Sequence, residues 1–224
     1  MAPAEWEALR LSFQVALSAT AIALPFGVAA AWILARRSFR GRGALEVLLN
    51  MPLVMPPVVT GWLLLMLFGH QGVIGGWLEE TLGLSVAFTW RGAALAAAVV
   101  SFPLLVRAVR LSFEAVDPGL EQAARTLGAR PLRVFLTVTL PLGRPGIAAG
   151  SLLAFARSLG EFGATVMLAG NIPCETRTVP LALYSLAQTP GAESRMTGLL
   201  IVSVTLSAAA LACGEWLARR PNHR

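Results

Sequence analysis

The sequence predicts an all-α fold, a polytopic helical membrane protein with about five transmembrane helices in a single domain over residues 1–224. Three observations predict it. Of the 224 residues, 56% are hydrophobic and only 13% are charged, whereas about 25% are charged in ordinary soluble domains. Several apolar stretches approach the roughly 20 residues that a helix needs to cross a bilayer. The arginines gather between these stretches, as basic residues do in the cytoplasmic loops of membrane proteins.

Five apolar stretches have the length and composition of membrane spans. They are Leu11–Ala35, Val47–Phe68, Ala87–Val109, Gly146–Leu168 and Thr197–Leu217. The apolar run Val179–Ala187 is too short to cross, so it predicts an interfacial or re-entrant helix on the outer side. The segment Gly72–Leu84 predicts another short helix along the outer surface. Prolines interrupt several spans, and Met55–Pro57 either forms an ordinary kink or lines a pathway where helices bend apart.

The placement of the arginines predicts the orientation of the chain. One side carries thirteen of them and the other side four, which are Arg10, Arg91, Arg177 and Arg195. The richer side comprises the segment after the first span, the segment between the third and fourth spans, and the C-terminal tail. Glu5 and Glu7 precede the first span, which is unlike a cleaved signal peptide. We therefore expect the N-terminus outside and the C-terminus in the cytoplasm.

The charged and reactive residues exclude several classes of function. The net charge is +6 and every basic residue is arginine. These arginines lie between apolar spans rather than on one soluble face, so we expect no nucleic-acid partner. Without lysine the chain has no P-loop, and any ATP-driven cycle needs a separate ATPase. The cysteines and histidines lack the spacing of a metal or redox site, so we expect no metal, cofactor or catalytic residue and no enzyme activity in this chain. They are Cys174, Cys213, His70 and His223.

The segment Asp117–Pro141 predicts two short helices in a cytoplasmic loop. Asp117 fits an N-cap and Pro118 a first helical position. Apolar residues then recur at helical spacing as far as Leu127, and Gly128 predicts the end of the first helix. Pro131 predicts the start of the second helix, and Leu140 with Pro141 its end before the fourth span. Such a pair either covers the helix bundle or fits into a groove on a soluble partner, whose motion then moves the adjoining spans.

This loop resembles the signature of binding-protein-dependent ABC importer permeases. That signature is Glu-Ala-Ala, three residues, Gly, about nine residues, an aliphatic residue, one residue and Leu-Pro. The matching positions here are Gln122, Ala123, Ala124, Gly128, Val138, Leu140 and Pro141. Gln122 replaces the glutamate of the family, and Glu121 precedes it. The resemblance implies that this is the loop that couples the permease to cytoplasmic ABC ATPase subunits, with Glu121 among its residues.

A second stretch, residues 155–185, resembles the oxyanion permeases for sulfate and molybdate. The segments Gly160–Thr165, Asn171–Pro173 and Glu175–Thr178 are most similar to the molybdate type. Cys174 stands where that family usually has glycine. The resemblance implies a molybdate permease of the cell (inner) membrane, close to the sulfate and thiosulfate permeases, with an external oxyanion-binding protein as partner. Molybdate, tungstate and sulfate are not distinguished by these residues.

Polar residues in the fourth predicted span are candidates for the pathway. Arg157 and Glu161 are four residues apart and are expected to form an ion pair, which either holds adjacent helices or serves transport. A bare carboxylate would repel a dianion, so we expect Glu161 to be neutralised by Arg157 or turned toward a neighbouring helix. With Glu161, the candidate pathway or gate residues are Ser158, Thr165 and Asn171, whose neutral side chains offer donors to an oxyanion.

The favoured interpretation is a permease that works as a C2 homodimer, because five spans are few for a closed pathway. The nearest alternative is the same machine for sulfate or thiosulfate. A secondary anion transporter or channel is an alternative of a different class. We would expect it to contain inverted repeats and an intramembrane acid relay, whereas this sequence has no visible repeat and a lone intramembrane carboxylate. A membrane enzyme would need a nucleophile and base, and no such set is visible.

Overall fold

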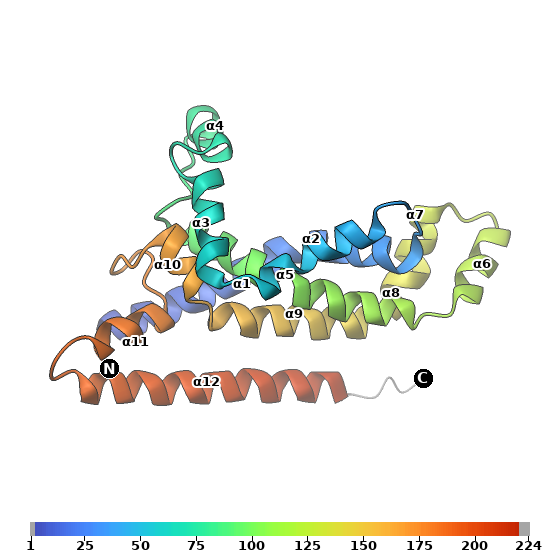
Figure 1. The fold of residues 1–224 in the computed structure, drawn as a ribbon. Helices are drawn as coiled ribbons and strands as arrows, with labels where there is room; N and C mark the ends of the chain where they lie inside the picture. Colours follow the sequence, from blue (N-terminus) through green and yellow to red (C-terminus); the bar gives the residue numbers. More distant parts are fainter. Residues whose placement is uncertain (1–2, 220–224) are drawn as a thin grey trace.

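A computed structural model describes residues 3–219, and all the secondary structure in this range is helical (Figure 1). The side chains of the last helix are described only in part, and Cys213, His223, Arg220 and Arg224 lie outside the described residues or side chains. The helices are α1 Pro3–Arg36, α2 Arg42–Val54, α3 Pro57–Phe68, α4 Val73–Leu82, α5 Trp90–Glu114, α6 Pro118–Thr126, α7 Pro131–Val134, the π-helix η1 Phe135–Thr139, α8 Leu140–Leu142, α9 Arg144–Leu159, α10 Gly163–Ala169, α11 Val179–Ala187 and α12 Glu193–Arg219.

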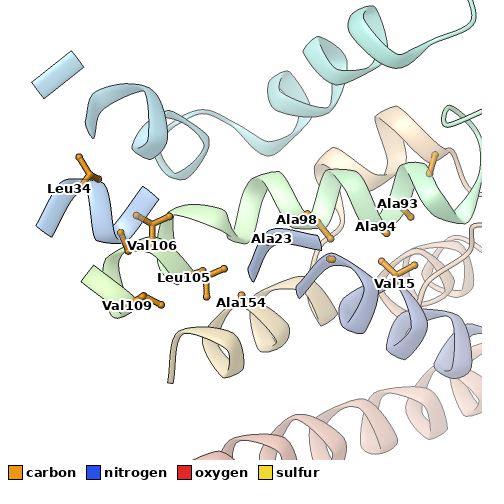
Figure 2. Close-up of a cluster of buried hydrophobic side chains, with 14 of the residues drawn as sticks. Val15, Ala23, Leu34, Ala93, Ala94, Ala98, Leu105, Val106, Val109 and Ala154 are labelled. Carbon is orange, nitrogen blue, oxygen red and sulfur yellow. The ribbon is translucent and has the colours of Figure 1, made fainter. Parts of the chain in front are cut away.

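Three long helices, α1, α5 and α9, pack along one another, and α12 lies along α9 (Figure 1). Their shared core combines alanines near one end of α5 with larger side chains, such as Leu105 and Val109, farther along it (Figure 2). Small residues allow membrane helices to approach closely. Gly146, for example, lies where a Cβ atom would be 2.1 Å from the Cβ of Ser112. The bundle is therefore held by close backbone packing.

Two of the predicted spans lie within long, unbroken helices. The first falls inside α1 and the third largely inside α5, and both helices are long and apolar enough to cross a membrane. Among the described residues, up to four spans are obtained if each of two bent helix pairs also counts as one. The fifth predicted span lies within the 27-residue helix α12. The two short helices predicted outside the spans are present as α4 and α11, and α11 has the predicted bounds.

The second predicted span, Val47–Phe68, is divided between two helices. The chain breaks between α2 and α3, whose axes differ in direction by 113°. Met55 and Pro56 are extended, with ψ angles of 143° and 130°, because a residue that precedes proline is pushed out of the helical region. Pro57 then begins α3 at a position where its missing N–H has no cost. The two prolines thus turn a predicted kink into a corner. α3 then packs on α10, and α4 at its far end stands away from the bundle (Figure 1).

The prediction of one helix for the fourth span is wrong. The helix predicted over Gly146–Leu168 stops at Leu159 and resumes as the separate helix α10 after a turn at residues 160–162. The second loop helix, formed by α7, η1 and α8, ends before α9 at Leu142, one residue after the predicted end at Leu140 and Pro141. The bend of 70° follows α8 and precedes α9. Gly143 lies at this bend, where a Cβ atom would be 2.3 Å from the ring of Phe113.

Candidate functional site

The helix α6 forms as its sequence predicts. The carboxylate Oδ1 of Asp117 accepts a hydrogen bond of 2.8 Å from the amide of Gly119, which satisfies a backbone donor that the helix leaves free. At the other end Gly128 has a φ of +85°, a conformation that costs glycine little. Asp117, Pro118 and Gly128 therefore determine both ends of the helix locally.

Most of α6 faces away from the rest of the chain. The α6 surface, which we define as Leu120, Ala123, Ala124 and Leu127, is exposed or half-buried, and Leu127 is 89% exposed. Gln122 is exposed as well. The neighbouring helical segment exposes Leu132 and Leu136, while Val138, Leu140 and Pro141 are half-buried. A protruding apolar helix surface of this kind is suited to contact with another protein.

Glu121 is the exception, since it is the only buried residue of α6. Its Oε1 lies 2.8 Å from Nε of Arg36, the last residue of α1. The hydroxyl of Thr139, at the end of η1, donates a hydrogen bond of 2.7 Å to the same oxygen. Nη2 of Arg36 also donates to the carbonyl of Val116, at 3.0 Å. Glu121 thus faces inward, whereas its neighbours Leu120 and Gln122 are exposed.

The segment after α6 is anchored to the bundle by an aromatic contact. The ring of Phe135 in η1 lies 5.2 Å from that of Trp32 in α1 and 6.1 Å from that of Phe113 in α5. Tilted and edge-on aromatic pairs at these separations are favourable. η1 therefore has a fixed position on the bundle, and Thr139 is held at its end beside Glu121.

The charged pair predicted for the fourth span joins the last turn of α9 to the turn between α9 and α10. Nη1 of Arg157 and Oε2 of Glu161 are 2.8 Å apart. The other oxygen of Glu161 accepts a hydrogen bond of 2.9 Å from the amide of Ala164, in the first turn of α10. The carboxylate is therefore both paired and used to cap a helix. Glu161 is buried, whereas Arg157 is partly exposed.

The three neutral candidates occupy different surroundings. Ser158 and Thr165 are buried inside the chain, and the hydroxyl of Ser158 lies 3.3 Å from that of Ser101 in α5. Asn171 lies in the loop before α11 and is half-buried. Its amide donates to Ser185, and its carbonyl accepts a hydrogen bond from Arg177, each at 2.8 Å. Ser158 and Thr165 therefore lie near Glu161. Asn171 instead connects the loop before α11 to Ser185 within α11.

The roles of Arg36 and Thr139 were missed by sequence reasoning. Arg36 entered only through the distribution of arginines, and Thr139 had no assigned role. Arg36 is separated from Glu121 by 85 residues, so no local spacing links them. A buried pairing at that separation depends on how α1, α6 and η1 pack together.

Comparison with known proteins shows the family of the chain. The family model for the "binding-protein-dependent transport system inner membrane component" matches residues 23–223. The chain belongs to this family. Among its relatives, the molybdenum transport system permease protein ModB of Escherichia coli K12 is 56% identical over 220 residues, covering 98% of this chain and 96% of that protein. The sulfate transport system permease protein CysT of the same organism is 40% identical over 184 residues, covering 81% and 66%.

Solved structures of transporters share the fold of this family member. A bacterial ABC transporter involved in the import of the acidic polysaccharide alginate aligns with a TM-score of 0.77 at 15% identity, covering 99% of this chain and 81% of that one. An inward-facing structure of the MetNI methionine ABC transporter aligns with a TM-score of 0.69 at 18% identity, covering 96% and 93%. At these identities the likeness concerns the fold alone.

Proposed function

We propose that this chain is the permease subunit of an ATP-driven importer that carries molybdate, or the similar tungstate, across the inner membrane. The observation that carries the proposal is the 56% sequence identity between this chain and a molybdenum transport permease, which extends along nearly the full length of both chains. Molybdate is delivered by an external oxyanion-binding protein. The chain supplies the path, and a separate ATPase supplies the energy.

The ATPase subunits bind at the α6 surface and the adjoining exposed residues of α7 and η1. Support comes from the exposure of Leu120 and Leu127 on a helix whose ends are fixed locally. The positions that match the permease signature lie on or beside this surface; they are Gln122, Ala123, Ala124 and Gly128. Leu140 and Pro141 continue the helical segment toward α9. Motion of the ATPases then reaches the spans through both ends of the loop.

Two copies of the chain enclose the pathway as a C2 homodimer. Support comes from α3, whose large side chains are mostly exposed although the helix is strongly apolar. These side chains are Val58, Val59, Trp62, Leu63, Met66 and Leu67. The N-terminus is outside and the C-terminus cytoplasmic, which puts α6 on the side of the ATPases.

Ser158, Glu161, Thr165 and Asn171 are proposed to lie beside the route of the oxyanion. The pairing of Glu161 with Arg157 supports this proposal, because it removes a charge that would repel a dianion. We predict that the triple variant Ser158→Ala, Thr165→Ala, Asn171→Ala slows uptake by about tenfold, as expected for a lost polar contact in the path. Uptake at the wild-type rate, with normal amounts of complex, would contradict the assignment.

A decisive experiment reconstitutes the chain with its candidate ATPase in lipid vesicles. ATP hydrolysis and uptake are measured with receptor loaded with molybdate, with receptor loaded with sulfate, and with empty receptor. We expect stimulation by the molybdate-loaded receptor and no uptake when the P-loop lysine of the ATPase is replaced by alanine.

The outcomes distinguish the remaining alternatives. Preferential stimulation by the sulfate-loaded receptor would assign the chain to sulfate import. The 40% sequence identity with a sulfate permease supports this alternative. Uptake driven by an ion gradient without ATP would indicate a secondary transporter. Failure of the ATPase to bind the wild-type permease would refute the importer proposal.

A further inference from the structure

The inner side of α6 is held by one buried cluster of polar side chains, which we call the Arg36–Glu121–Thr139 cluster. A single carboxylate oxygen of Glu121 receives both the guanidinium of Arg36 at 2.8 Å and the hydroxyl of Thr139 at 2.7 Å. The side chains of Arg36 and Glu121 are 14% and 8% exposed, and Thr139 is 1% exposed. Charge-assisted hydrogen bonds in such surroundings are strong and directional.

The cluster joins three helical segments that are far apart in the sequence. Arg36 is the last residue of α1, Glu121 lies in the first turn of α6, and Thr139 is the last residue of η1. Arg36 additionally holds the carbonyl of Val116, between α5 and α6. Since α6 buries no other residue, Glu121 is its one buried attachment to the bundle.

The π-helix η1 determines where Thr139 points. The amide of Leu140 bonds to the carbonyl of Phe135, five residues earlier, so this segment contains one residue more than an α-helical turn. Without the extra residue the side chain at position 139 would be rotated by about 100° around the helix axis. Such single π turns occur often at functional sites. Here the turn directs a hydroxyl onto Glu121 while Phe135 remains packed on Trp32.

Stability alone explains this arrangement poorly. The free energy needed to remove two charged groups from water offsets much of the free energy of their attraction. Replacing a buried ion pair by apolar residues is therefore often neutral or stabilising. A buried pair instead fixes one relative position of the elements that carry it. The cluster fixes the position of α6 relative to the end of α1.

We propose that Glu121, held by Arg36 and Thr139, is a positioning residue that transmits displacement of α6 to α1 during transport. This inference rests on the proposed function, since it assumes that an ATPase moves α6. The exposed residues of α6 bind the partner, and the inward carboxylate conveys its motion to the bundle. Loss of the cluster therefore uncouples ATP hydrolysis from transport while the ATPase stays bound.

The test uses the complete complex of permease, ATPase and loaded receptor in lipid vesicles. Two variants weaken the cluster, Thr139→Val by removing one hydroxyl and Arg36→Gln by removing the charge. The matched control is Glu114→Gln, which breaks the pair between Arg110 and Glu114 within α5, whose Nε–Oε1 distance is 2.7 Å. Measured quantities are the amount of bound ATPase, basal hydrolysis, receptor-stimulated hydrolysis and molybdate uptake.

We expect Arg36→Gln to lower uptake per ATP hydrolysed by about tenfold or more, the size expected for loss of a charge-assisted hydrogen bond. Thr139→Val has a smaller effect in the same direction, and bound ATPase and basal hydrolysis stay at the wild-type level. The double variant Arg36→Glu, Glu121→Arg restores uptake relative to Arg36→Glu alone.

Three results would overturn the inference. The first is wild-type uptake per ATP in both cluster variants, and the second is an equal loss in Glu114→Gln. The third is loss of bound ATPase together with uptake, because the cluster would then serve only folding or docking. Failure of the wild-type complex to assemble would instead refute the importer itself, and this inference with it.

Discussion

Gly128 ends α6 in a backbone conformation that side chains with L chirality rarely adopt, with a φ of +85°. Its amide donates to the carbonyl of Arg125, at 2.9 Å, and the amide of Ala129 donates to that of Ala124, at 3.1 Å. A Cβ atom at Gly128 would meet nothing within 4 Å. The backbone conformation, rather than lack of space, therefore requires glycine here.

We predict that Gly128→Pro reduces ATPase binding by about tenfold or more without preventing membrane insertion. Proline fixes φ near about −65° and removes the amide donor, so α6 loses its end and its direction. Co-purification of the ATPase with the permease measures the effect. Gly191→Pro is the matched control, because Gly191 also has a positive φ, +79°, but lies before α12. Equal ATPase binding by the two variants would refute docking through α6.

Cys174 also has a left-handed backbone, with a φ of +66°. This conformation gives a physical reason for the glycine usual at that position in similar permeases. The thiol is exposed, and a hydrogen bond to the Glu7 carboxylate, together with its negative charge, raises the pKa of Cys174 above its ordinary value. Cys174 is therefore a weak nucleophile at neutral pH despite its exposure.

We predict that Glu7→Gln makes Cys174 several-fold more reactive toward a maleimide. Loss of the carboxylate lowers the thiol pKa, so a larger fraction is thiolate at any fixed pH below that pKa. Alkylation rates between about pH 7 and pH 9 measure the shift in a Cys213→Ser background. The rate profile of Glu7→Gln should move to lower pH, and an unmoved profile would exclude Glu7 as the cause.

At the scale of elements, α3 is held against α10 by close backbone contact. A Cβ atom on Gly61 would lie 2.6 Å from the carbonyl oxygen of Ala164, and one on Gly163 would lie 2.9 Å from the Cβ of Pro57. Backbone atoms cannot move aside as a flexible side chain does. Gly61 and Gly163 thus allow α3, which follows the corner after α2, to pack closely on α10.

We predict that Gly61→Leu separates α3 from α10 and destabilises the permease by about 1–3 kcal/mol, as overpacking of a close contact does. The midpoint of thermal unfolding in detergent should fall by several degrees. Gly198→Leu in α12 is the control, because a Cβ atom there meets nothing within 4 Å. If both variants unfold at the same temperature, the contact between α3 and α10 is not tight.

At the scale of the molecule, the long helices connect two different ends. The loop helices α6 and α7 lie at one end, while the N-terminus and α11 lie at the other (Figure 1). α1 runs between them, from the contact of Glu5 with Arg195 to the Arg36–Glu121–Thr139 cluster. A displacement at the loop is therefore connected through one continuous helix to the opposite end.

We predict opposite labelling of these ends in intact cells. In a Cys213→Ser background, Cys174 should react with a membrane-impermeant maleimide from outside. In a chain without native cysteines, Leu127→Cys should react only after the inner membrane is permeabilised, because basic loops stay in the cytoplasm. The reverse pattern would invert the proposed orientation and separate α6 from the ATPase.

Features determined by neighbouring residues could be predicted from the sequence by itself. Asp117, Pro118 and Gly128 specify α6 because capping depends on residues within a turn of each end. Long apolar runs predict α1 and α5 because a bilayer demands length and hydrophobicity. Spacing of four residues likewise indicated the pair Arg157 and Glu161.

Only the tertiary structure decided the corner of 113° between α2 and α3, the break at Glu161 and the inward direction of Glu121. Prolines mark where a helix is interrupted, but the direction taken afterwards depends on what the next helix packs against, here α10. The pairing of Arg36 with Glu121 spans 85 residues. Such a contact exists only because packing of α1, η1 and α6 excludes water from one carboxylate, a condition that no local pattern contains.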